Sequence, residues 1–197
     1  METAQKSVKF DPGFAQHTTI LSISAEYIYS QLEKFKNFGQ KKMKFKMLSS
    51  QLVHMAENNV GFCLGCLLWA VCIKSEKEVQ ITGNPCLGDT FNKDETVEEI
   101  DYSIEFFNRL SKDFKYYLNE SYTVKSEYIK YLELYKEFLL LNMNFVNTKT
   151  TDDLILPEGL KIPEQKNIDI IKEKIESVVK SGDLLDLEKV FSLVYNG

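Results

Sequence analysis

Val60-Gly-Phe-Cys-Leu-Gly-Cys-Leu-Leu-Trp-Ala-Val-Cys-Ile73 is a run of fourteen residues without a charged side chain. It holds the protein's one tryptophan and three of its four cysteines. Its apolar residues fall on every side of a helix rather than on one stripe. That pattern is typical of a helix at the middle of a core or inside a membrane. The run therefore predicts a central helix over about residues 60–74.

The length of this run favours a core over a membrane. At about 1.5 Å per residue, fourteen residues reach about 21 Å, whereas bilayer hydrocarbon is about 30 Å thick. Asn58 and Asn59 bound the run on one side, and Lys74 and Glu76 bound it on the other. We therefore expect a buried helix and no transmembrane segment.

Apolar residues at spacings of three and four predict further helices on both sides of the central one. We expect these helices at about residues 25–36, 41–57, 97–117, 126–145, 167–180 and 183–194. The pattern Thr96-Val-Glu-Glu99 is a capping box, which predicts a helix start at that threonine. Residues 78–82 alternate at period two and predict at most one short strand. The fold class is therefore all-α, an irregular bundle of six or seven helices.

Turn residues divide the chain into four expected parts. Residues 1–13 form an N-terminal arm that ends in Asp-Pro-Gly, and residues 14–146 form the main helical domain. Residues 147–166 form a link marked by Pro157, Gly159 and Pro163, and residues 167–197 form a helical hairpin packed on or beside the main domain.

Composition and charge give expectations about source and compartment. The net charge is −5, but residues 1–50 carry +4, so the remainder carries −9. Arg109 is the one arginine among 24 basic residues, which suggests an A/T-rich genome, such as a viral, protozoan or low-GC bacterial one. The N-terminus lacks the apolar core of a secretory signal, and the cysteines lie in apolar sequence. We expect a cytoplasmic, reducing compartment and no secretion.

Motifs for catalysis or metal binding are weak. Cys63 and Cys66 have C-x-x-C spacing, but with Cys72 they would lie on one apolar helix, where buried thiols are the simpler interpretation. His54-Met-Ala-Glu57 reverses the order of the di-iron bundle motif and occurs once. We therefore predict no catalytic residue, no metal site and no cofactor. An enzyme that relies on scattered Asp, Lys and Tyr residues is a second alternative.

Gly61 and Gly65 have the spacing that lets two helices approach closely. In a soluble core this spacing favours contact with another helix of the same chain. A dimer contact is the alternative.

The strongest surface signal is a stretch of thirteen residues with six lysines and three phenylalanines between them. Positive charge interleaved with aromatic rings suits single-stranded nucleic acid, an acidic protein partner or an anionic membrane surface. In the simplest interpretation, the phenylalanines face the core and the lysines form a solvated rim. The candidate binding residues are Lys34, Phe35, Lys36, Phe38, Lys41, Lys42, Lys44, Phe45 and Lys46.

These features predict a non-catalytic helical binding protein. We expect an accessory or assembly factor that acts through protein–protein contacts, alone or as an oligomer. The first alternative is a protein that binds RNA or single-stranded DNA through residues 34–46.

Overall fold

The computed structural model describes residues 25–34, 42–75, 93–114, 126–142, 154–181 and 184–195. All the regular elements in these ranges are helices, which confirms the all-α prediction. Besides the helix over residues 25–34, the helices are α2 (Lys42–Ser75), α3 (Lys93–Phe114), α4 (Ser126–Leu141), α5 (Gln165–Ser181) and α6 (Leu185–Phe191). The expected strand at residues 78–82 lies outside the described ranges.

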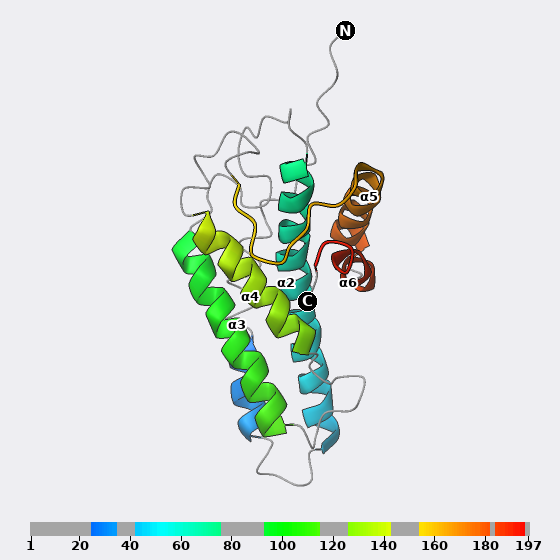
Figure 1. The fold of residues 1–197 in the computed structure, drawn as a ribbon. Coiled ribbons are helices and arrows are strands. Elements are labelled where there is room, and N and C mark those ends of the chain that lie inside the picture. The colour runs from blue at the N-terminus through cyan, green and yellow to red at the C-terminus, as the bar shows by residue number, and fades with distance from the viewer. Residues whose placement is uncertain are drawn as a thin grey trace.

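α2 is the central element of the bundle. α4, α5 and α6 all pack against it, while α3 packs on α4 and α6 packs on α5. Figure 1 shows α3 and α4 on one side of α2, with α5 and α6 on the other. Every residue from Val60 to Ile73 is buried except Phe62, which is half-buried, and Trp69 is only 7% exposed. The prediction that this run is a buried central helix is confirmed.

The predicted break before the central helix is wrong. α2 continues without interruption through Asn58 and Asn59, so the two expected helices are one helix of 34 residues. Asparagine in a helix interior costs well under about 1 kcal/mol relative to alanine. Burial of Leu52 and Val53 on one side of the pair and of Val60 on the other outweighs that cost.

The continuity of α2 also removes the length argument against a membrane. Ser50–Ser75 has 26 residues, which span about 39 Å, and by length and composition alone it could cross a bilayer. The rest of the fold buries 76% of its most apolar window. A core helix passes the same test of length and composition, so the expected absence of a transmembrane segment stays a prediction.

Aromatic packing holds the helix 25–34 against α3. The Tyr29 ring meets Phe106 and Phe114 edge to face, with centroids 5.8 and 5.2 Å apart. The Tyr29 hydroxyl donates a hydrogen bond of 2.8 Å to Asp113 Oδ2, and the Tyr102 hydroxyl donates to Glu26. Burial together with the Asp113 contact raises the pKa of Tyr29 from 10.0 to about 12.

α3 begins three residues before the predicted capping box. Thr96 lies inside the helix, so its expected role as the N-cap is wrong. Asp94 and Glu95 are the second and third residues of α3, where negative charge suits the helix dipole. The apolar spacing that predicted this helix corresponds to a buried face, because Ile100, Phe107, Leu110 and Phe114 are buried.

The segment 154–164 packs on the helical body. Its Leu154, Pro157 and Pro163 are buried, and Figure 1 shows it crossing α2 between α4 and α5. Leu160 N donates to Pro157 O at 3.2 Å, and Gly159 has φ of 89°, as expected for the third residue of a type II turn. Leu160 then pairs antiparallel with Tyr195. The division of the chain at residues 147–166 stays a prediction.

The glycine spacing of α2 seats a helix of the same chain. A Cβ atom at Gly61 would lie 1.7 Å from Leu184 Cδ2, and one at Gly65 would lie 3.8 Å from Leu187 Cδ1. Both leucines belong to the C-terminal segment that forms α6 and its N-cap. The same-chain interpretation of Gly61 and Gly65 is therefore confirmed, and α6 ends at Phe191, earlier than predicted.

Candidate interaction surfaces

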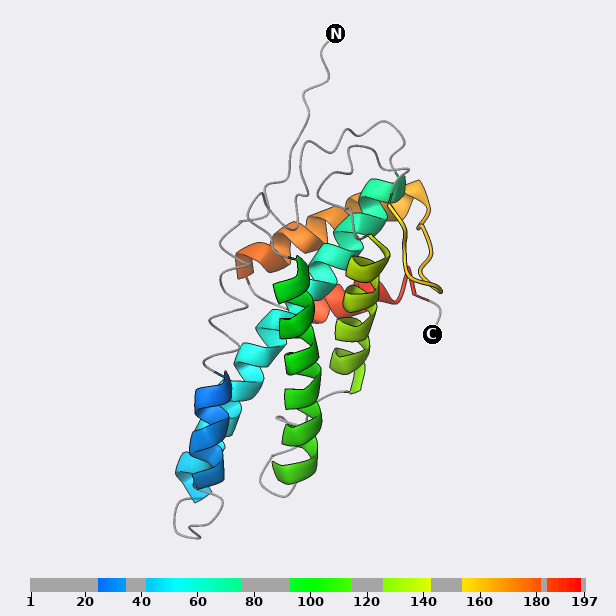
Figure 2. The same ribbon diagram turned by 90° about the vertical axis from the view of Figure 1, so that its left-hand side faces the viewer.

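The predicted basic stretch lies at one end of the bundle. Lys34 is exposed at the carboxyl end of the helix 25–34. Lys42, Lys44, Phe45 and Lys46 fall in the first turns of α2. In both views the end of the helix 25–34 and the start of α2 lie at the same end of the molecule (Figures 1 and 2). Four candidate residues lie outside the described ranges, namely Phe35, Lys36, Phe38 and Lys41.

This end of the molecule concentrates positive charge, and we call Lys34, Lys42, Lys44 and Lys46 the basic end. The first turn of α2 has no acidic residue, and the first acidic residue of the helix is Glu57. The amino end of a helix already carries partial positive charge from its peptide dipoles. Acidic residues are the usual ones in the first turn of a helix, and α2 has lysines there instead. The basic end is therefore favourable for binding a negatively charged group from another molecule.

A second surface lies where α4 ends, and sequence analysis missed it. Leu140, Leu141 and Ile155 are 46%, 40% and 53% exposed. Four apolar residues in a row, from Phe138 to Leu141, occupy more than one side of a helix. Phe138 and Leu139 are buried, on the helix that packs against α2. The next two leucines are left outside.

The buried side chain of Asn142 fixes this second surface. Its Nδ2 donates to the carbonyl oxygens of Phe138 and Ile155, both at 2.7 Å. Its Oδ1 accepts a 2.8 Å hydrogen bond from Ile155 N. One side chain therefore satisfies both backbone groups of Ile155 and ties the segment 154–157 to the end of α4. This pairing fixes the backbone of Ile155 beside Asn142, the residue that follows Leu141.

Acidic side chains lie on the same side of α4 as the exposed Leu140 and Leu141. Glu133 and Glu137 are exposed. At about 100° per residue, these glutamates, Leu140 and Leu141 fall within about 100° of arc on the helix. The last turn of α4 contains no basic residue to offset the negative end of its dipole. We call Glu133, Glu137, Leu140, Leu141 and Ile155 the α4 end.

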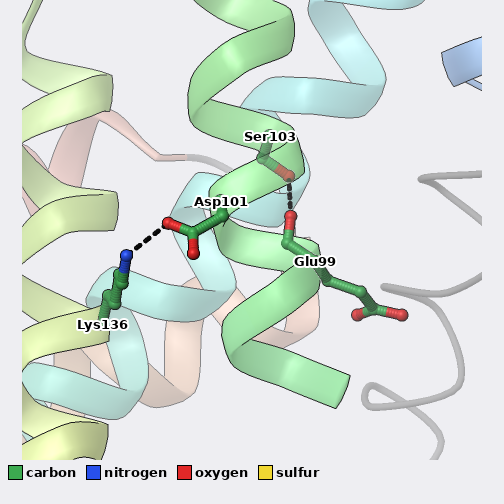
Figure 3. Close-up of polar contacts among 4 residues, drawn as sticks. All are labelled: Glu99, Asp101, Ser103 and Lys136. Carbon is green, nitrogen blue, oxygen red and sulfur yellow. Dashed lines mark hydrogen bonds and ion pairs between the residues drawn. The ribbon is translucent and has the colours of Figure 1, made fainter. Parts of the chain in front are cut away.

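The two lysines of α4 are held elsewhere. Lys136 Nζ lies 2.5 Å from Asp101 Oδ1 on α3, as Figure 3 shows. The same figure shows Ser103 of α3 donating to the carbonyl oxygen of Glu99, at 2.8 Å. Lys130 Nζ lies 3.8 Å from the centroid of the Tyr195 ring. Because both cations face neighbouring elements, the outward stripe of α4 is acidic and apolar.

Three buried side chains, Cys63, Cys72 and Tyr128, are shifted toward their neutral forms. Burial raises the pKa of the Cys63 thiol, and it raises that of Cys72 from 9.0 to about 12. Burial and the nearby Glu57 carboxylate raise the pKa of Tyr128, whose hydroxyl donates to Glu57 Oε1 at 3.0 Å. A catalytic thiol needs a lowered pKa, so these shifts oppose activation of Cys63 and Cys72.

Metal binding has little support in the described part of the chain. No group of three or more His, Cys, Asp or Glu residues there is placed to hold an ion. His54 is exposed, while the Glu57 carboxylate accepts the Tyr128 hydrogen bond. His54 is therefore a surface histidine, and the absence of a metal site stays a prediction.

Comparison of the chain with protein-family models, with curated proteins and with solved structures finds no match.

Proposed function

We propose that this is a non-catalytic helical binding protein, an accessory or assembly factor that acts through protein–protein contacts at the α4 end. One observation carries the proposal: three exposed aliphatic side chains stand on a backbone that Asn142 holds in place. A reducing, cytoplasmic compartment suits such a protein, because Cys63 and Cys72 are buried thiols.

Rigid apolar anchors are what a protein interface needs. Single exposed apolar residues are normal on a protein surface, but contiguous ones tend to mark interaction sites. Leu140 and Leu141 sit on a helix, and Ile155 is held by hydrogen bonds on both sides of its backbone. Little conformational entropy is lost when such groups bind, so the apolar area they bury is available for affinity.

Site-specific photo-crosslinking tests this proposal. A benzophenone amino acid replaces Leu141 in one preparation and exposed Asn108 of α3 in a matched control, and each is irradiated in lysate of the source cell. We expect adducts at position 141. Excess unlabelled wild-type protein should compete for the partner and suppress these adducts, whereas excess unlabelled double variant Leu140→Ser, Leu141→Ser should not suppress them. Equal adducts at both positions, or none at 141, would contradict a binding role for the α4 end.

A second candidate function is binding of RNA or single-stranded DNA at the basic end. Its support is the exposed Lys34 beside a helix whose first turns hold three lysines and no acid. Lysines at such a site release phosphate counterions, so binding should weaken steeply with salt.

Fluorescence anisotropy with a labelled oligonucleotide tests the second candidate. We expect micromolar binding that falls across a salt series and is lost when Lys41, Lys42, Lys44 and Lys46 become glutamate. Exposed Lys161 and Lys189, changed in the same way, serve as the control. Binding that ignores salt, or that the control lowers equally, excludes the basic end.

A further inference from the structure

We propose that the partner of the α4 end is the basic end of a second copy of this chain, so that copies associate head to tail. This inference rests on the proposed function, because it names what the α4 end binds. It also explains the α4 end and the basic end together, as the two sides of one contact.

The charges of the two ends are complementary. The α4 end carries Glu133 and Glu137 beside the negative end of a helix dipole. The basic end carries Lys42, Lys44 and Lys46 at the positive end of the α2 dipole, with Lys34 nearby at the carboxyl end of the helix 25–34. The first turn of α2 holds no acidic residue and the last turn of α4 holds no basic residue, so neither turn compensates its own dipole. In a head-to-tail contact, each terminus supplies that charge to the other.

The sequence of the basic end also contains apolar residues. The α4 end presents Leu140, Leu141 and Ile155. The first turns of α2 alternate lysines with large apolar residues, as in Lys-Met-Lys-Phe-Lys over residues 42–46. A nucleic acid could use the lysines and Phe45, but it would leave the exposed aliphatic side chains of α4 unexplained.

The arrangement of the bundle makes the contact intermolecular. The start of α2 and the carboxyl end of α4 lie toward opposite ends of the molecule (Figure 1). The two surfaces therefore cannot meet within one copy. A contact between unlike surfaces is heterologous, and it continues into a ring or an open chain of copies.

Light scattering after size exclusion tests the proposal, with variants at each end. The α4-end variant is Leu140→Ser, Leu141→Ser, and the basic-end variant is Lys42→Glu, Lys44→Glu, Lys46→Glu. We expect the mean mass of the wild type to rise with protein concentration and to fall with salt. Each variant alone should weaken self-association by at least about tenfold.

Mixing the two variants gives the sharpest result. The α4-end variant keeps a working basic end, and the basic-end variant keeps a working α4 end. We expect an equimolar mixture to form a one-to-one dimer and nothing larger, because only one productive pair of surfaces remains. A variant that combines the three lysine changes with Glu133→Lys and Glu137→Lys should regain self-association through exchanged charges. Circular dichroism and urea unfolding of each variant check that the fold is kept.

Each outcome separates this inference from the proposed function. A wild type that stays monomeric, with specific adducts at position 141 to another protein, overturns self-association and leaves the binding role standing. A monomeric wild type without such adducts overturns both. A monomeric wild type whose basic end binds the oligonucleotide with steep salt dependence favours the nucleic-acid function. Mixed variants that form larger assemblies show that a different surface makes the contact.

Discussion

Asn142 is the residue on which the α4 end depends most. Asn142→Ala removes three hydrogen bonds and leaves both backbone groups of Ile155 without their partner. We expect the free energy of unfolding to fall by about 1–2 kcal/mol, because a lost hydrogen bond costs about 1 kcal/mol and the two Ile155 groups left without a partner are partly buried. Urea unfolding measures the change. Asn108→Ala, at an exposed position of α3, should stay within about 0.5 kcal/mol of the wild type.

Tyr29 should make stability depend on pH in the alkaline range. Its pKa is about 12 in the fold and 10.0 in the ordinary state, so the folded protein holds this proton more tightly. The stability that this preference contributes is fully present below pH 10 and is lost as the pH rises from 10 toward 12. At pH 7, Tyr29→Phe should cost about 1–2 kcal/mol through the lost hydrogen bond to Asp113.

Urea unfolding at pH 7 and pH 11 tests this dependence. The deficit of Tyr29→Phe at pH 7 should shrink or vanish at pH 11, because the wild type then loses the contribution of its hydroxyl. Tyr27, which is 66% exposed, gives the control, and Tyr27→Phe should match the wild type at both pH values. A deficit that stays constant with pH would show that the Tyr29 hydroxyl does not titrate as the fold requires.

At the scale of elements, the contact between α2 and the segment that forms α6 and its N-cap gives Gly61 and Gly65 different tolerance to substitution, although the two glycines look alike in sequence. Either glycine changed to alanine gains up to about 1 kcal/mol of helix propensity. At Gly65 the new methyl group meets Leu187 at ordinary contact distance, so Gly65→Ala should stabilise the protein. At Gly61 it would overlap Leu184, which must move. We expect Gly61→Ala to be less stable than Gly65→Ala by about 1–2 kcal/mol in urea unfolding.

A double-mutant cycle isolates the cause of that difference. Leu184→Ala removes the side chain that meets the new methyl group. In that background the gap between Gly61→Ala and Gly65→Ala should fall to about 0.5 kcal/mol or less. A gap that persists would mean that Gly61 is needed for some reason other than the close approach of Leu184.

Sequence patterns predicted elements best where long-range packing agrees with local periodicity. The stripe of α3 through Ile100 and Phe107 and the buried run around Trp69 follow directly from apolar spacing. Local stop and start signals were less reliable. Asn58 does not break α2, because such a signal carries about 1 kcal/mol and the burial on both sides of it carries more. α3 begins three residues before Thr96.

One of the two candidate surfaces could be predicted from local sequence, and the other could not. The basic end could be found from composition, because lysine charge does not depend on the fold. The α4 end could not, because exposure of Leu141 depends on which side of α4 the rest of the bundle covers. The pairing of Asn142 with Ile155 joins residues thirteen positions apart through a side chain, and no periodicity records it.

The whole molecule is organised so that α2 is covered from two sides. α4 covers one side, and α5 and α6 cover the other. Opening the segment 60–73 therefore requires both layers to leave, which is global unfolding. The helix 25–34 is held mainly through Tyr29 and Leu32, while its Tyr27 faces solvent. We expect that helix to open at a lower free energy than the segment 60–73.

Trp69→Ala combined with hydrogen exchange tests this organisation. Trp69 is 7% exposed, and its removal should lower the free energy of unfolding by about 3–5 kcal/mol. If the segment 60–73 exchanges only by global unfolding, its slowest amides should lose protection by that same free energy. The amides of the helix 25–34 should exchange faster than these in the wild type and change little in the variant. Equal exchange in the two segments, or a loss below about 1 kcal/mol, would mean that α2 is not the core on which the other helices depend.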